Sequence, residues 1–250
     1  MTKSDLRQRL NLSEAVEDYL KAIYGLREEL AHEGQDDPRV TTNALASRLG
    51  VAPGSVTGMV KKLAENDLVV HTPYYGVALT PMGEHLALEL VRHHRLIELY
   101  LTHVVGFGWD EVHDQADALE HAISEEFEDR IDRLLGSPTH DPHGDPIPSK
   151  DGKLSEPLTQ SLSDVMPDAE RQWLITRVLT QASDRLRYLA DLGLVPGTTV
   201  QLVDREPFNG PLLLRIVEGT PDILHTTPQI SPEIGASILI APVDVAQSSS

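Results

Sequence analysis

Apolar residues recur at helical spacing in the first part of the chain. They return every three or four positions between residues 16 and 30, and Ser13 followed by Glu14 is typical of a helix start. A second helix is predicted over residues 42–49, because a threonine can cap its start and a glycine follows its end. After a short turn, a third helix is predicted to open at Ser55 with an apolar face of its own.

Two short strands are predicted after the third helix. Residues 68–70 and 77–79 are mostly apolar, and Pro-Tyr-Tyr-Gly at 73–76 between them is typical of a turn. Helix, tight turn, helix and hairpin together form a winged helix-turn-helix, in which the third helix reads DNA and the hairpin is the wing. The pattern therefore predicts a DNA-binding unit near the N-terminus.

The middle of the chain predicts two longer helices and a linker. Pro81 and Gly83 are expected to break the chain before a helix of roughly residues 84–104, and another helix is predicted over residues 110–135. Residues 136–157 are rich in Pro, Gly, Ser, Asp and His. Such a composition is typical of a linker or an extended arm.

The C-terminal part predicts one more helix, over about residues 168–190, and then a small β domain. Short apolar segments separated by turn residues favour a β-barrel. The final Gln-Ser-Ser-Ser is expected to be disordered. The fold class is therefore mainly α with small β parts. The predicted strands are residues 199–204, 212–217, 223–226 and 237–243.

Composition narrows the possible chemistry. The 250 residues include no cysteine, so any metal site must use nitrogen and oxygen donors. The net charge of −18 counts weakly against DNA binding, because phosphates repel acidic surfaces, but the acids crowd between Asp110 and Asp132. No apolar run is long enough to span a membrane, and the polar N-terminus lacks the layout of a secretion signal. We therefore expect a cytoplasmic protein with no membrane partner.

Histidines and acids gather in the predicted central helices. Six of the eleven histidines lie between His85 and His121. Side chains four, seven and eight positions apart share one face of a helix, so several of these groups are expected to converge. Carboxylate oxygens with one or two imidazoles suit Mn(II) or Fe(II). The candidate ligands at this spacing are His94, Glu98, His113, Asp117, Glu120 and His121.

Two other interpretations stay open at this point. Zinc hydrolases use His-Glu-x-x-His or its inverse, His-x-x-Glu-His, but Asp117 stands where the inverse motif needs histidine. No separate general base or nucleophile is evident, so an enzyme is not expected and a metal-dependent hydrolase is the less favoured alternative. The other alternative is a metal-independent winged-helix regulator whose histidines are structural and whose effector is organic.

The chain resembles the diphtheria-toxin-repressor family of metal-dependent transcriptional regulators, including its manganese-responsive members. The resemblance rests on residues 17–24, 44–70, 92–98 and 112–121, and on Gly-Asp-Pro-Ile-Pro at 144–148. It covers residues 10–148 well and the C-terminal part more loosely. It implies a winged helix-turn-helix domain (1–80), a helical dimerisation and metal-binding domain (81–148), a linker and connecting helix (149–180) and an SH3-like, FeoA-like domain (181–246).

The resemblance also implies two metal sites. In iron-responsive relatives the positions of Asp18 and Asp117 carry Met and Cys, so the oxygen donors here favour Mn(II) over Fe(II), and other divalent transition metals can also bind such ligands. The regulatory site would use Asp18, Asp117, Glu120 and His121. The second site would use His94, Glu98 and His113.

Two positions depart from the pattern of the relatives. Manganese-type relatives with a paired-metal site carry a second carboxylate three residues after the aspartate, where this chain has Lys21, so such a pairing is not expected. The acid and the amide that the third domain should donate to the second site align near Ala182 and Arg185. Gln181 and Asp184 are the neighbouring side chains that could replace them.

DNA contacts are predicted at the start of the reading helix and at the wing. We expect a homodimer that binds a palindromic double-stranded operator and represses genes of metal uptake and homeostasis when Mn(II) is bound. Because the ligands must lose protons, metal-induced DNA binding should weaken below about pH 6. The predicted DNA-binding residues are Ala52, Pro53, Gly54, Ser55, Thr57, Lys61, Lys62, Tyr74 and Tyr75.

Overall fold

The computed structural model describes residues 13–243, apart from residues 33, 36–37, 155–157 and 220–223. The described residues form two compact units. The first holds the chain up to residue 94 together with 120–123 and 148–153, and the second holds 95–119, 124–147 and the chain from 154 onward. The C-terminal Gln-Ser-Ser-Ser lies outside the described residues. No helix among those described has the length and apolar character needed to cross a membrane.

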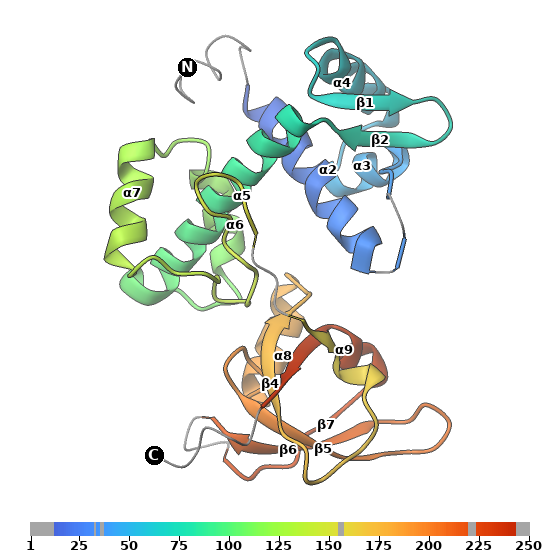
Figure 1. The fold of residues 1–250 in the computed structure, drawn as a ribbon, viewed down its shortest axis with the longest axis vertical. Coiled ribbons are helices and arrows are strands. Elements are labelled where there is room, and N and C mark those ends of the chain that lie inside the picture. The colour runs from blue at the N-terminus through green and yellow to red at the C-terminus, as the bar shows by residue number, and fades with distance from the viewer. Residues whose placement is uncertain (1–12, 33, 36–37, 155–157, 220–223, 244–250) are drawn as a thin grey trace. The chain divides into compact units, whose positions relative to one another are not determined.

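The first unit contains the predicted helix-turn-helix and its hairpin (Figure 1). Helix α2 (Glu14–His32) packs on α3 (Thr42–Leu49), which packs on α4 (Pro53–Glu65). Strands β1 (Val69–Thr72) and β2 (Gly76–Leu79) pair antiparallel and contact α4 and α2, respectively. The winged helix-turn-helix prediction is confirmed.

The core of this unit follows the helical spacing of the sequence. Val16, Leu20 and Ile23 of α2 are buried, as are Leu45 of α3 and Val60 of α4. Burying a full aliphatic side chain stabilises a fold by about 1.5–3 kcal/mol, so this stripe holds the three helices together. The position of α2 is therefore tied to the position of the reading helix.

Two helices begin earlier than predicted, each at a proline. Helix α4 begins at Pro53 rather than at Ser55. Helix α5 (Pro81–Tyr100) begins at Pro81 rather than after Gly83, and Thr80 Oγ1 accepts a hydrogen bond from the backbone N–H of Gly83 at 3.1 Å. Proline is tolerated at the first helical position, because a backbone N–H there would have no partner within the helix.

The predicted helix over residues 110–135 is two helices, α6 (Val112–Leu119) and α7 (Glu125–Leu134). Ser124 caps α7, since its side-chain oxygen accepts a hydrogen bond from the backbone N–H of Phe127 at 3.2 Å. Acidic residues in the first turn of α7 also suit the positive end of a helix. Residues 120–123 therefore lie outside both helices, and periodicity alone missed this break.

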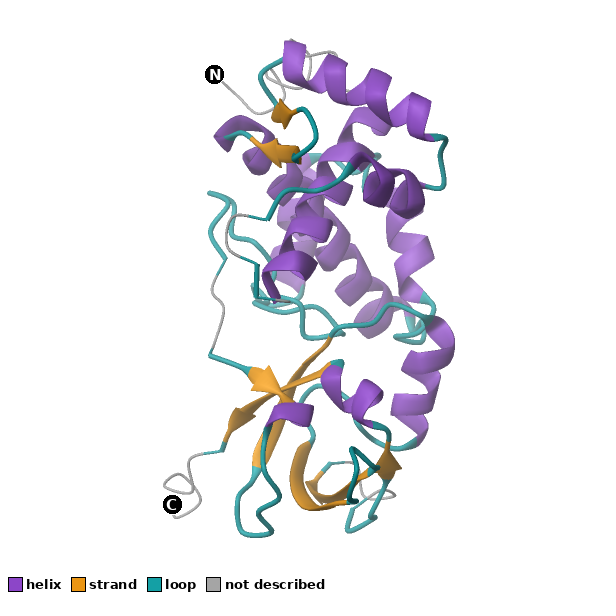
Figure 2. Cartoon of the chain, turned by 90° about the vertical axis from the view of Figure 1, so that its right-hand side faces the viewer, coloured by secondary structure: helices purple, strands orange, loops and turns teal. Residues whose placement is uncertain are grey.

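A six-stranded antiparallel sheet forms most of the C-terminal part (Figure 2). Trp173, Ile175, Leu202 and Leu214 are buried in its core, together with Leu186 of helix α8 (Ser183–Asp191). In spatial order the strands are β3 (Gln160–Ser161), β8 (Ile238–Pro242), β4 (Trp173–Val178), β5 (Thr199–Arg205), β6 (Leu212–Glu218) and β7 (Gln229–Ile230). The sheet is of the SH3-like type, so the predicted fold class is confirmed.

The predicted helix over residues 168–190 is wrong. Strand β4 occupies its middle, because Trp173 and Ile175 alternate with partly exposed residues and point into the sheet core. Only α8 at its end is helical. The predicted strand at residues 223–226 is also not observed over its described residues 224–226, and β7 forms slightly later, followed by helix α9 (Pro232–Ala236).

Candidate functional site

Three potential metal ligands come together in the first unit. Asp18 stands on α2, whereas Glu120 and His121 stand in the turn after α6. His121 Nε2 lies 2.9 Å from Asp18 Oδ1 and 3.7 Å from Glu120 Oε1, and each residue offers a ligand atom within 4.8 Å of the other two. Two carboxylates and one imidazole at this spacing can hold a divalent cation.

Acids surround His121 on both ring nitrogens. Its Nδ1 lies 2.7 Å from Glu17 Oε2, opposite the contact with Asp18. Burial alone would lower the pKa of His121, but Glu17, Glu120 and Asp18 outweigh burial and raise it above its usual range. Burial also raises the pKa of Asp18, against the opposing effect of His121. A cation that binds this group therefore competes with a proton for the imidazole.

Glu120 has a second set of partners on its other oxygen. Lys21 Nζ donates a hydrogen bond to Glu120 Oε2 at 2.6 Å and lies 2.8 Å from His94 Nδ1. His94 Nδ1 is itself 2.6 Å from Glu120 Oε2. Glu120 is only 2% exposed, and a buried carboxylate without a cationic partner would be strongly unfavourable. Lys21 supplies that partner.

A second group of potential ligands lies in the second unit. Glu98 of α5, Asp141 and His143 are all buried, and their ligand atoms also lie within 4.8 Å of one another. His143 Nδ1 is 3.8 Å from Glu98 Oε2, and His113 Nδ1 of α6 is 3.2 Å from Glu98 Oε1. The structure thus brings together Glu98 and His113, as predicted by resemblance, and adds two residues that the sequence analysis did not name.

His143 is oriented as a metal-binding histidine would be. Its Nε2 donates a hydrogen bond to the carbonyl oxygen of Trp109 at 2.7 Å, because a carbonyl can only accept. The opposite nitrogen, Nδ1, is buried and has no hydrogen-bond partner among the described residues. Metal-binding histidines usually donate their other N–H to a carbonyl or a carboxylate, which fixes the ring and directs the remaining lone pair at the ion.

The two carboxylate oxygens of Asp141 have different surroundings. Its Oδ1 accepts hydrogen bonds from the backbone N–H groups of His143 at 2.8 Å and Asp145 at 2.9 Å. Its Oδ2 is buried without a hydrogen-bond partner in the described part of the chain. Burial raises the pKa of Asp141 well above its usual range, and the negative charges of Asp145 and Glu98 add to the effect. The positive charges of His143 and Arg95, whose Nε lies 4.0 Å from Oδ2, lower this pKa by less than the other effects raise it, so a cation in the group would reduce the remaining cost.

The loop that presents these two ligands is fixed against strand β4. The backbone N–H of Val178 donates to the carbonyl oxygen of His143 at 2.9 Å. Gly144 has a φ of +84°, and a side chain there would overlap the carbonyl oxygen of Thr176. Glycine is therefore required at this position, both for its backbone conformation and for the close approach.

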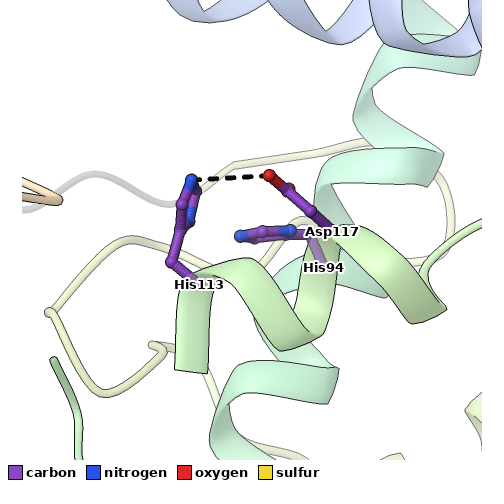
Figure 3. Close-up of side chains that lie close together, drawn as sticks. All are labelled: His94, His113 and Asp117. Carbon is purple, nitrogen blue, oxygen red and sulfur yellow. Dashed lines mark ion pairs between the residues drawn. The ribbon is translucent and has the colours of Figure 1, made fainter. Parts of the chain in front are cut away.

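Asp117 and His113 form a pair one turn apart on α6. His113 Nε2 lies 3.7 Å from Asp117 Oδ2, and Figure 3 shows this ion pair as a dashed line. The third residue labelled there, His94, comes from α5. The Asp117 side chain is 51% exposed, which leaves it accessible to water. The resemblance assigns Asp117 to the regulatory site, and the structure places it beside His113.

The side chains considered as ligands from the third domain have other partners. Gln181 Nε2 is 3.4 Å from Asp145 Oδ2, and Asp184 accepts a hydrogen bond from the backbone N–H of Arg185 at 2.8 Å. Neither belongs to a convergent group of metal ligands in the described part of the chain. Asp141 and His143 were missed because their segment reads as a linker. A histidine between two aspartates in a Pro- and Gly-rich stretch is the signal that could have drawn attention to them.

The predicted DNA-binding residues form an exposed surface on the reading helix and the wing. All nine are exposed, and the N-cap Ala52 of α4 makes no side-chain hydrogen bond to the helix end. Ser55, predicted to open this helix, lies inside its first turn. Tyr74 is fully exposed at the tip of the hairpin with a φ of +69°, next to Tyr75 at 73% exposure. Exposed aromatic side chains at a wing tip are available to a DNA backbone.

Comparison with known families finds three matching domains. Residues 11–77 match the N-terminal DNA-binding domain of iron-dependent repressors, and residues 80–149 match the metal-binding and dimerisation domain of the same repressors. Residues 166–225 match the FeoA domain. The C-terminal match begins before the boundary at residue 181 that the resemblance implied, in keeping with β4 being a strand of this domain.

Two similar repressors match this chain along most of their own length. The diphtheria toxin repressor of Corynebacterium diphtheriae is 31% identical over 86% of this chain and 96% of its own length. The iron-dependent repressor IdeR of Mycobacterium tuberculosis is 32% identical over 80% of this chain and 87% of its own length.

Among solved structures, a manganese-dependent transcriptional repressor in complex with manganese is similar with a TM-score of 0.79. It is 34% identical, and the match covers 91% of this chain and all of that one. ScaR with bound Zn²⁺ is similar with a TM-score of 0.70 at 32% identity, over 91% of this chain and 99% of that one.

Proposed function

Since this chain belongs to the diphtheria-toxin-repressor family of metal-dependent, DNA-binding repressors, we propose that Mn(II) controls its binding to a palindromic operator. The observation that carries this proposal is the convergence of Asp18, Glu120 and His121, which joins the helix-turn-helix unit to a metal-binding turn. Members of the family are transcriptional repressors and not enzymes, which disfavours the hydrolase alternative.

The donor atoms favour Mn(II) over Fe(II) for the regulatory site. Asp18 and Glu120 offer hard carboxylate oxygens and His121 one imidazole, while the chain has no cysteine and therefore no thiolate. Hard oxygens with few nitrogens suit Mn(II), whereas softer sulfur ligands would shift the preference toward other metals. Two similar solved structures are of manganese-dependent repressors, which supports the same choice.

The fold provides a route from this site to the reading helix. Asp18 stands on α2, which packs on α3, and α3 packs on α4. Glu120 and His121 stand in a separate turn of the same unit. When these residues share one divalent ion, which supplies the positive charge that draws them together, the distance between α2 and the turn is fixed. The reading helix is then held in one arrangement, which favours the DNA-binding state.

The second group, Glu98, Asp141 and His143 with His113 beside it, is the natural second site of the same protein. The buried Asp141 Oδ2 and His143 Nδ1 have no hydrogen-bond partner in the described part of the chain, so both atoms are available to a cation. We expect this site to stabilise the loop at residues 139–148 and the strand packed on it, not to read DNA. His94, expected here by resemblance, has its Nδ1 2.6 Å from Glu120 Oε2.

Dimer formation fits the exposed apolar surface of the helical domain. Val104, Val105, Leu119, Phe127 and Leu134 are large apolar side chains exposed in the single chain. The residues of this region match a domain described as a dimerisation domain. A two-fold dimer presents two reading helices, which explains why a palindromic operator is expected.

The proposal is tested by DNA affinity with and without metal. A duplex would be selected from a random-sequence pool in the presence of Mn(II), and its affinity for chelator-stripped protein would then be measured by fluorescence anisotropy, before and after Mn(II) addition. Tighter binding with Mn(II), and a two-fold symmetric selected sequence, are expected. Equal affinities in both conditions would remove metal control and favour the organic-effector alternative.

Lys61 is expected to contact phosphate rather than bases. It is exposed on α4, with Glu65 3.9 Å away as its ion-pair partner. Replacing Lys61 with Ala should weaken binding about equally for specific and non-specific duplexes, and should reduce the slope of log affinity against log salt by about one. The same salt titration on a Lys153→Ala variant, which changes a lysine of the exposed 149–153 turn, should leave the slope unchanged.

Mn(II) binding by the second group should weaken as the pH falls. Burial would lower the pKa of His143, but the carboxylates of Glu98 and Asp141 outweigh it and raise the pKa to about 9. Below that pH the imidazole carries a proton that the ion must displace, so the apparent affinity should fall about tenfold per pH unit. Calorimetry in two buffers of different ionisation enthalpy would detect the released proton. An affinity that does not change between pH 6 and 8 would argue against His143 as a ligand.

A further inference from the structure

The two oxygens of the Glu120 carboxylate face different partners. Oε1 lies toward His121, 3.7 Å from Nε2, on the side of the group that Asp18 completes. Oε2 lies 2.6 Å from both Lys21 Nζ and His94 Nδ1. Glu120 therefore divides its carboxylate between a candidate metal site and a second position that an ammonium group occupies.

The Lys21 ammonium sits where a second cation would have to bind. A second metal ion bound to Glu120 Oε2 would also have His94 Nδ1 as a ligand. Lys21 Nζ lies within 2.8 Å of both of these atoms. The Lys21 side chain is only 23% exposed, so water screens its charge weakly. The ammonium and a metal ion cannot share this position.

The formal charges of the surroundings agree with a single divalent ion. Glu17, Asp18 and Glu120 contribute three carboxylates around His121, and Lys21 contributes one positive charge. The remaining two negative charges match one divalent ion. A second ion would leave an excess of positive charge in a largely buried place, which is unfavourable.

We propose that Lys21 is a built-in cation of the regulatory site, which restricts the site to one metal ion and weakens its affinity for that ion. This rests on the proposed function, because it takes Asp18, Glu120 and His121 as metal ligands. Lys21 is then a residue that sets the stoichiometry and the metal concentration at which the protein responds. Without metal, the same ammonium keeps the buried Glu120 carboxylate paired.

Mn(II) titration of three purified variants tests this role, with free Mn(II) followed by electron paramagnetic resonance. Lys21→Glu should bind one more ion per chain than the wild-type protein, because it exchanges the ammonium for a third ligand. Lys21→Gln should keep the wild-type count but bind its Glu120-dependent ion about tenfold more tightly, since a nearby positive charge is gone. Lys153→Glu makes the same charge change at an exposed lysine and should match the wild-type protein.

The outcomes separate this proposal from the function on which it rests. Wild-type count and wild-type affinity in both Lys21 variants would overturn the role of Lys21 alone. If Glu120→Gln also leaves the wild-type count unchanged, the regulatory site itself is absent and both proposals fail. If circular dichroism shows that Lys21→Glu does not fold, the Mn(II) affinity of Lys21→Gln alone tests the role of Lys21.

Discussion

Replacing Glu120 with glutamine is expected to reduce the DNA affinity measured in excess Mn(II) to that of the metal-free protein. Typical coupling between two binding sites corresponds to a loss on the order of 5- to 150-fold. An amide oxygen is a weaker metal ligand than a carboxylate, and the Lys21 ammonium at 2.6 Å would lose its counter-charge. Fluorescence anisotropy with the selected duplex measures the effect directly.

A matched control for this variant is available on α7. Glu126 is exposed and pairs with Arg130 one turn away, at 2.7 Å. Exposed pairs of this kind contribute little, so Glu126→Gln should respond to Mn(II) as the wild-type protein does. A full Mn(II) response in Glu120→Gln would contradict the assignment of Glu120 as a ligand, provided that circular dichroism shows both variants folded.

Replacing His143 with alanine is expected to remove one bound ion per chain while leaving the regulatory ion in place. The variant loses the imidazole whose Nδ1 faces Glu98 and whose Nε2 holds the Trp109 carbonyl. Loss of a direct ligand should weaken metal binding at the second group by more than the 10- to 100-fold typical of outer-shell changes. Metal analysis after gel filtration at a fixed low concentration of free Mn(II) would count the ions.

His140 offers the comparison for this second variant, because it belongs to the same loop but not to the buried group. It is exposed, and its Nδ1 lies 2.9 Å from the hydroxyl of Thr139. His140→Ala should therefore keep the wild-type ion count. An unchanged count in His143→Ala would show that Glu98 and its neighbours do not hold an ion in solution.

The sequence predicts the reading unit well, because its helices are amphipathic and its turns carry Gly and Pro. Val16, Leu20 and Ile23 recur at a helical period and are buried as that period requires. Strand β4, in contrast, lies within a segment that is predicted as a helix, because its periodicity is ambiguous. Trp173 to Val178 is a short apolar run, and such a run cannot be assigned to helix or strand by periodicity alone.

The candidate metal groups were only partly predictable. The spacing of His113 and Asp117 on one helix is local, and the structure confirms that they lie side by side. Glu120 and His121 are predicted on the same helix face as His113 and Asp117, but α6 ends at Leu119, before them. Their approach to Asp18 depends on packing between segments far apart in the sequence, which no local pattern encodes.

The roles of Asp141 and His143 are even harder to predict from local sequence patterns. Nothing in their own segment indicates that it lies against Glu98, because the contact depends on α5 and on the loop docking beside β4. Their chemistry is visible only once Asp141 and His143 are seen to converge with Glu98, with Asp141 Oδ2 and His143 Nδ1 buried and without a hydrogen-bond partner among the described residues. Buried polar atoms are nearly always satisfied in folded proteins, so such a pair points to a bound cation.

The most direct test of the whole account is the anomalous scattering of a crystal soaked in Mn(II). We expect one peak per chain among Asp18, Glu120 and His121 and a second among Glu98, Asp141 and His143. A fully soaked crystal with no anomalous peak at either group would contradict the claim that these side chains converge in order to bind metal.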